Sequence, residues 1–126
     1  MNTKVALRIA LAITVALSAN IHADLYVSGY RYVHVIGLLF LVQAAAGFAV
    51  ALLLVLGAPW TFYLASLGLA AGSLGGFILS RTVGVFGFTE VGWQPAPQAA
   101  ISVGAELCTI VLAMIWLIPR ARTLIR

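Results

Sequence analysis

The chain has 126 residues, of which 63% are hydrophobic and 8% charged, and its formal net charge is +4. An average soluble domain is about 45–50% apolar and about 25% charged. A water-soluble globule of this size could not bury so much apolar side chain, because its surface is large for its volume. The composition therefore excludes a soluble enzyme, a secreted disulfide scaffold and a nucleic-acid-binding domain, and it predicts an integral membrane protein.

Four stretches are apolar enough, and long enough at about 20 residues, to cross a bilayer as helices. We place these spans at about residues 5–21, 32–56, 62–80 and 97–118. The connection at 57–60 is short, so the second and third spans form an antiparallel hairpin. The longer loops are 23–31 and 81–96. The predicted fold is an all-α, integral membrane four-helix bundle, a single transmembrane domain over residues 1–126.

The basic residues predict the orientation of the bundle. Arg31 and Arg81 lie beside the two longer loops. The other five flank the ends of the bundle: Lys4, Arg8, Arg120, Arg122 and Arg126. Because cytoplasmic segments carry the excess of Lys and Arg, we expect both termini to be cytoplasmic and both longer loops to lie outside. The expected location is a bacterial inner membrane, with the lipid bilayer as the first partner.

The first span has a second interpretation. Lys4 and Arg8 followed by the apolar run 9–17 also resemble the first two regions of a secretory signal peptide, with small residues for cleavage near Ser18 or after Ala23. We favour a retained span, because the following residues lead directly into another span. Cleavage would leave three spans with the same orientation.

Small residues predict how the spans pack, since helices in lipid associate through close approach of their backbones. In the third span Gly68, Gly72 and Gly76 recur at steps of four. The second span offers a matching set: Ala44, Gly47 and Ala51. We expect these two faces to meet inside the chain. The alternative is that the glycine stripe forms the seam of a homodimer.

Glu106 lies about ten residues into the fourth predicted span. A carboxylate at this depth costs at least a few kcal/mol unless it is protonated, paired or hydrated. Helical spacing places it on one small and polar face of the span, together with Ala99, Ser102, Thr109 and Ala113. This face predicts that Glu106 points into the bundle.

Polar residues of the other spans reach a similar depth, about 12–17 Å below the outer surface at the helical rise of about 1.5 Å per residue. The predicted polar layer consists of Thr14, Gln43, Ser73, Ser102 and Glu106. It has two interpretations. The layer is either a set of interhelical hydrogen bonds that fixes the register of the helices, or a ligand or proton site in which Glu106 titrates.

His22, His34 and Asp24 lie near the outer rim and together offer two imidazoles and a carboxylate, a set that zinc, copper or iron accepts. This composition is common by chance, so we favour no metal centre and expect no cofactor. The second outer loop, 81–96, mixes apolar residues with glycines. Such a loop is expected to lie along the membrane surface or to fold over the mouth of the bundle.

The stretch from His22 to Tyr30, the runs 37–40 and 75–77, and Glu106 form a pattern. In this pattern the chain resembles small uncharacterised four-span bacterial membrane proteins over most of its length, which implies a fold and no activity. Small multidrug exporters have a similar length and span number, but their essential carboxylate lies in span one. Small fluoride channels carry a glycine-arginine signature there, which this chain lacks.

The chain contains no Ser-His-Asp set, paired-cysteine motif, HExxH helix or Walker loop. We therefore expect it not to be an enzyme. The leading hypothesis is a small accessory or assembly subunit that contacts a larger membrane protein. The alternative is a small binding protein or transporter for a ligand, proton or cation, acting as a homo-oligomer through the layer around Glu106.

Overall fold

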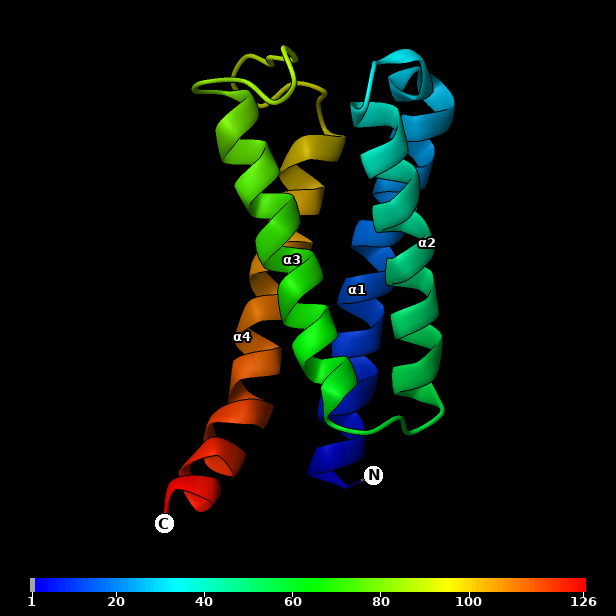
Figure 1. The fold of residues 1–126 in the computed structure, drawn as a ribbon. Coiled ribbons are helices and arrows are strands. Elements are labelled where there is room, and N and C mark those ends of the chain that lie inside the picture. The colour runs from blue at the N-terminus through cyan, green and yellow to red at the C-terminus, as the bar shows by residue number, and fades with distance from the viewer. Residues whose placement is uncertain (1) are drawn as a thin grey trace.

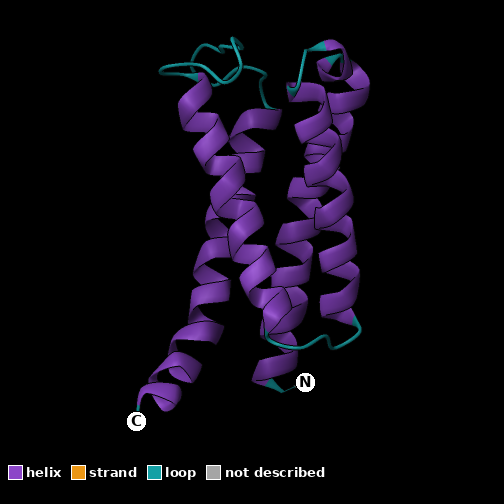
Figure 2. Ribbon diagram, in the orientation of Figure 1, coloured by secondary structure: helices purple, strands orange, loops and turns teal. Residues whose placement is uncertain are grey.

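The computed structural model describes residues 2–126. They form four α-helices and one short 3-10 turn (Figures 1 and 2): α1 (Thr3–Ser28), η1 (Tyr30–Tyr32), α2 (Ile36–Val55), α3 (Thr61–Ser80) and α4 (Gln98–Ile125). All four helices are long and apolar enough to cross a membrane. The prediction of an all-α, multi-pass fold with four candidate spans is confirmed.

The helices alternate in direction, so both termini lie at the same end of the bundle (Figure 1). The connection from α2 to α3 is at that end too. Residues 29–35 and 81–97 lie at the opposite end, which we call the distal end.

The helices are packed as two pairs, α1 with α2 and α3 with α4, and α1 also packs against α4. α2 and α3 also meet, but they pack less extensively than any of these three pairs. Within the first pair the two helices approach closely at Gly47, where an added Cβ would lie 2.8 Å from the Cβ of Ala19. Near the termini, Leu11 and Leu54 are fully enclosed, and the rings of Tyr63 and Trp116 stack at 3.8 Å.

The helix bounds differ from the predicted spans at three places. α1 continues about two turns beyond residue 21, because His22 and Leu25 keep to its buried face. α2 begins only at Ile36, because the 3-10 turn and Val35, with a positive φ of 64°, come first. α4 runs through Pro119 to Ile125.

The predicted contact between the glycine stripe of α3 and α2 is wrong. A Cβ added at Gly68, Gly72 or Gly76 would meet no atom within 4 Å. The small face of α2 is used by α1 instead, since Gly47 lies against Ala19. The glycine stripe is thereby left without a partner inside the described chain.

Candidate functional site

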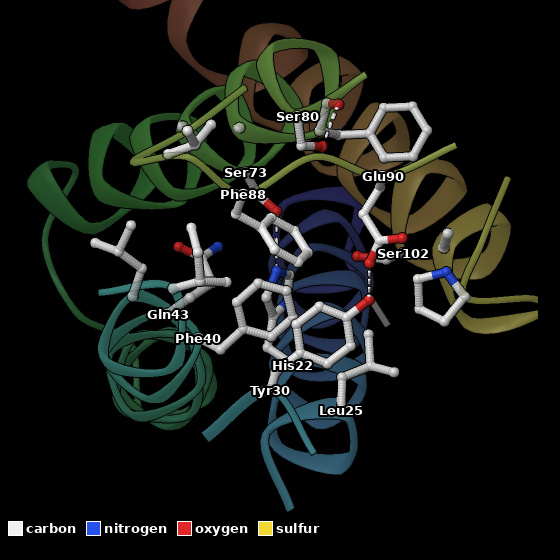
Figure 3. Close-up of a pocket in the computed structure, with 18 of the residues that line it drawn as sticks. His22, Leu25, Tyr30, Phe40, Gln43, Ser73, Ser80, Phe88, Glu90 and Ser102 are labelled. Atoms are coloured by element: carbon white, nitrogen blue, oxygen red, sulfur yellow. Dashed lines mark hydrogen bonds between the residues drawn. The ribbon is translucent and has the colours of Figure 1, made fainter. Parts of the chain in front are cut away.

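A cavity of about 350 Å³ lies between the two helix pairs towards the distal end (Figure 3). Its walls are mainly apolar and aromatic, with Leu25, Phe40 and Phe77 among them. Its floor, the part deepest along the helices, is polar and consists of His22, Gln43, Ser73, Ser102 and Glu106. An apolar pocket of this size with a few convergent polar groups is the usual form of a small-molecule site.

Glu106 is the centre of the floor and is 2% exposed. Its Oε1 accepts hydrogen bonds from three serines on three helices: Ser18 of α1 (3.0 Å), Ser73 of α3 (2.5 Å) and Ser102 of α4 (2.7 Å). The buried face predicted for the fourth span is confirmed, since Ala99, Ser102, Glu106, Thr109 and Ala113 are all buried on α4.

The second carboxyl oxygen, Oε2, accepts no hydrogen bond from residues 2–126. Among these residues only Arg8 Nε is both fully enclosed and unpaired. Because Oε2 is unpaired and yet not fully enclosed, it borders open space. Glu106 lines the cavity and also a hollow of only about 10 Å³ beside Ser66 and Thr109. Glu106 therefore lines the cavity with a carboxyl group that has one oxygen without a hydrogen bond.

His22 continues the polar floor. Its Nδ1 lies 2.8 Å from the carbonyl oxygen of Ser18, and its Nε2 lies 3.1 Å from Oγ of Ser73 (Figure 3). A carbonyl only accepts, so Nδ1 carries a proton and donates. The Ser73 hydroxyl has a single hydrogen and stands between Nε2 and Oε1 of Glu106.

Because the Ser73 hydroxyl has one hydrogen, its bonds to His22 and Glu106 can form in two ways, which differ in the position of one proton. In the first, Ser73 donates to a Glu106 carboxylate and a doubly protonated His22 donates to Ser73. In the second, a protonated Glu106 donates to Ser73, and Ser73 donates to a neutral His22. One proton is therefore shared across His22, Ser73 and Glu106, and reversing the two hydrogen bonds moves it between the ends.

The remaining residues of the predicted polar layer are placed differently. Gln43 lines the cavity, and its Nε2 donates to the carbonyl oxygen of Leu69 at 3.0 Å. Thr14 does not reach Glu106. It accepts a hydrogen bond from Thr109 at 2.8 Å, about one turn of α4 closer to the termini.

The distal end of the cavity is closed by a roof, formed by Tyr30 and residues of the loop 81–97. The Tyr30 hydroxyl donates to Oε1 of Glu90, and the Tyr30 ring meets the ring of Phe88 edge-on at 5.8 Å (Figure 3). Burial, together with the hydrogen bond to Glu90, raises the pKa of the Tyr30 phenol. Of the two arrangements expected for this loop, it adopts the one over the mouth of the bundle.

Arg81 holds the loop 81–97 in place. Its Nε donates to the carbonyl oxygen of Gly92 at 2.8 Å, and its Nη1 donates to Ser80 Oγ at 2.7 Å. A further bond joins Nη2 to the carbonyl oxygen of Gln94, and the guanidinium lies 3.9 Å above the Phe77 ring. Arg81 therefore ties the loop to the end of α3.

The candidate metal ligands are not brought together. His22 is buried in the floor of the cavity, whereas His34 and Asp24 are exposed. No group of three His, Cys, Asp or Glu side chains arranged to hold a metal ion occurs in residues 2–126.

Sequence reasoning missed three residues of the site, Ser18, Tyr30 and Glu90, and it placed His22 at the rim instead of in the floor. Ser18 and His22 follow Leu11 and Val15 on one face at helical spacing. This periodicity could have placed both in the bundle if the first span had been continued past residue 21. No periodic signal connects Tyr30 with Glu90.

No protein-family model, curated protein or solved structure matches the chain. What the site does has to follow from its own geometry.

Proposed function

We propose that this protein is a small-molecule- and proton-binding protein of a bacterial inner membrane, with Glu106 as the anchoring group and no enzymatic activity. The observation that supports the proposal is the free Oε2 of a carboxyl group that is 2% exposed and borders a cavity of about 350 Å³. All of its hydrogen bonds come from uncharged serine hydroxyls.

A purely structural role, in which hydrogen bonds fix the register of the helices, does not account for this arrangement. Hydrogen bonds between membrane helices contribute about 0.6 kcal/mol each on average, and a buried carboxyl group costs at least a few kcal/mol at this depth. Paired serines or threonines, such as Thr14 and Thr109, fix register without that cost. Chains of Glu and His within a membrane are typical of proton relays, which favours a role for the shared proton.

We place both termini in the cytoplasm, because five of the seven basic residues belong to the end of the bundle that carries the termini. In this orientation the distal cavity lies in the outer half of the membrane. We also retain the first span in the mature protein, because Ser18 and His22 of α1 complete the floor.

Native mass spectrometry of the protein extracted gently from its own membrane tests the proposal. The wild type is expected to carry a small noncovalent ligand, and Glu106→Gln is expected to lose it. Asp24→Asn is the matched control, because it also removes an acid but lies at an exposed position that does not line the cavity. A wild type without any ligand, or a Glu106→Gln variant that keeps the ligand, would contradict the proposal.

A second candidate function is that of an accessory or assembly subunit. It is favoured by the face of α3 around Gly68, which is exposed and has no partner within the described chain. Small residues let a helix of another membrane protein approach closely. Co-purification of one larger membrane protein with the wild type, and its loss from Gly68→Leu, would support this function.

A further inference from the structure

Building on the proposed binding function, we propose that the ligand is a lipophilic amine and that it enters the cavity sideways from the lipid, between α2 and α3. The observations behind this concern the walls of the cavity, its roof and the free oxygen on its floor.

The residues that line the cavity between α2 and α3 point to an opening on this flank of the bundle. Leu39 and Val42 of α2 line it and are nevertheless 45% and 54% exposed. On the opposite side, Gly72 and Gly76 of α3 line it, and a Cβ added at either glycine meets nothing within 4 Å. The opening is therefore bordered by two exposed apolar side chains on α2 and by two glycines, which have no side chain, on α3. It lies at the depth of the lipid chains. We call this opening the flank portal.

The flank portal has a definite lower edge. Gln43 Nε2 donates to the carbonyl oxygen of Leu69, which joins α2 to α3 at the level of the floor. Above this bond, the two helices leave the space between them to the cavity.

The distal end offers no comparable entrance. The Tyr30–Glu90 hydrogen bond and the Tyr30–Phe88 ring contact cross the roof from one helix pair to the other. Arg81 anchors the same loop to α3. With the roof closed and the flank open, the route into the cavity runs through lipid, and a ligand that uses it has to be soluble there.

The free oxygen on the floor determines the head group of the ligand. The shared proton lies on the Oε1 side in both arrangements of the hydrogen-bond chain, because Ser73 contacts Oε1. Oε2 is therefore an acceptor in either arrangement, and the ligand has to supply a donor.

An ammonium fits this acceptor better than a hydroxyl. In the arrangement with a carboxylate, its hydrogen bonds come only from uncharged hydroxyls, so an ammonium provides a positive charge in place of the shared proton. The wall carries aromatic rings, with Phe40 at 5.1 Å from the His22 ring and at 4.7 Å from the Tyr30 ring. Such rings attract cations through their faces.

The first test compares phenethylamine with phenethyl alcohol, which has the same skeleton and a neutral head group, on the full chain in lipid nanodiscs. The amine is expected to raise the thermal unfolding midpoint in a saturable way, because a ligand that binds the folded state stabilises it. The alcohol is expected to bind at least tenfold more weakly. Glu106→Gln is expected to weaken binding of the amine at least tenfold. Asp24→Asn is expected to leave binding unchanged, because Asp24 is exposed and does not line the cavity.

The second test addresses the flank portal through the association rate of phenethylamine, followed by tryptophan fluorescence. Trp93 is a suitable reporter, since its ring lies 5.4 Å from that of Phe77 in the cavity wall. Gly72→Phe and Gly76→Phe are expected to slow association at least tenfold. Gly68→Phe is the matched control on the same stripe, because Gly68 does not line the cavity and an added Cβ there also meets nothing.

The outcomes separate this inference from the function on which it rests. Equal binding of the alcohol and the amine overturns the ligand class. Wild-type association in both portal variants overturns the lateral route. If phenethylamine does not bind but native mass spectrometry still finds a ligand that depends on Glu106, the amine inference fails and the proposed function stands. If the native protein carries no ligand, the proposed function fails as well.

Discussion

At the scale of single residues, one carboxyl oxygen connects three helices. Oε1 of Glu106 accepts hydrogen bonds from the hydroxyl groups of Ser18, Ser73 and Ser102. Ser73 also contacts His22. The Ser73 hydroxyl thus has two partners on other helices, whereas four of the six serines bond within their own helix: Ser28, Ser66, Ser80 and Ser102. The difference predicts unequal effects of otherwise identical substitutions.

Ser73→Ala is expected to lower the free energy of unfolding by about 1 kcal/mol more than Ser66→Ala, within the range of measured interhelical bonds. Ser66 is the control, because it is also a serine of α3 but donates only to the carbonyl oxygen of Phe62 in its own helix, and it is fully buried, whereas Ser73 is half-buried. Unfolding by denaturant in mild detergent measures both variants. Equal losses would show that the bonds of Ser73 contribute no coupling between helices.

The Tyr30 phenol is expected to stay protonated well above its ordinary pKa of 10.0, because burial and the bond to Glu90 raise that pKa. The folded state then holds the proton more tightly than the unfolded chain. This contribution to stability is complete below pH 10 and is lost as the pH rises above it.

Ultraviolet absorbance of phenolate, measured against pH for the wild type and Tyr30→Phe, checks this expectation. The difference between the two curves is the titration of Tyr30. A midpoint at the ordinary value would show that the roof is open to water.

At the scale of elements, the 3-10 turn η1 rests directly on the start of α2. A Cβ added at Gly37 would lie 2.7 Å from the carbonyl oxygen of Tyr30 and 2.8 Å from the Cα of Arg31. Both atoms belong to the backbone, so neither can rotate away. Gly37 is therefore what lets the turn that carries Tyr30 approach the bundle.

Gly37→Ala is expected to destabilise the protein by about 1–3 kcal/mol, the usual cost of overpacking. Gly104→Ala is the control, because an added Cβ meets nothing there, and alanine favours a helix. Thermal unfolding of both variants provides the comparison. A Gly37→Ala variant as stable as Gly104→Ala would contradict the close contact between η1 and α2.

Much of the fold could be predicted from the sequence, because a membrane span requires only length and apolar character. The buried face of α4 could be predicted for a similar reason, since the helical period alone determines which residues share a face with Glu106. Neither inference requires knowledge of what the helix packs against.

The rest could not be predicted, because it depends on partners. The spacing of Gly68, Gly72 and Gly76 predicts a face of small residues, but it does not identify the helix that packs against this face. The small face of α2 packs against α1 instead, through Gly47 and Ala19. His22 was assigned to the rim because the apolar run weakens after residue 21, although the helix continues. Tyr30 and Glu90 are sixty residues apart in two loops, and no local pattern pairs them.

At the scale of the whole molecule, two helix pairs are closed against each other near the termini and held apart at the distal end by the cavity (Figure 1). The closed end contains the stack of Tyr63 and Trp116, with the Arg120 guanidinium 3.1 Å above the Trp116 ring. The proposed orientation places these basic and aromatic side chains at the cytoplasmic surface, where such residues are enriched in membrane proteins.

Cysteine labelling tests the orientation in a Cys108→Ser background. Val91→Cys, at an 82% exposed position of the loop 81–97, is expected to react with an impermeant maleimide in intact spheroplasts. Thr123→Cys, at an exposed position of the last turns of α4, is expected to react only after the membrane is opened. The reverse pattern would place the cavity on the cytoplasmic side.

The position of Glu106 on the last of the four helices has a consequence for how the protein is made. Ser18 and Ser73 precede Glu106 by 88 and 33 residues, so the two helices that carry these hydroxyls leave the ribosome before α4 does. Until then, α1 and α2 are held together by the close contact of Ala19 with Gly47. Closure of the bundle is therefore a late step of biogenesis, completed when the ribosome releases α4 and its acid reaches hydroxyls that are already in place.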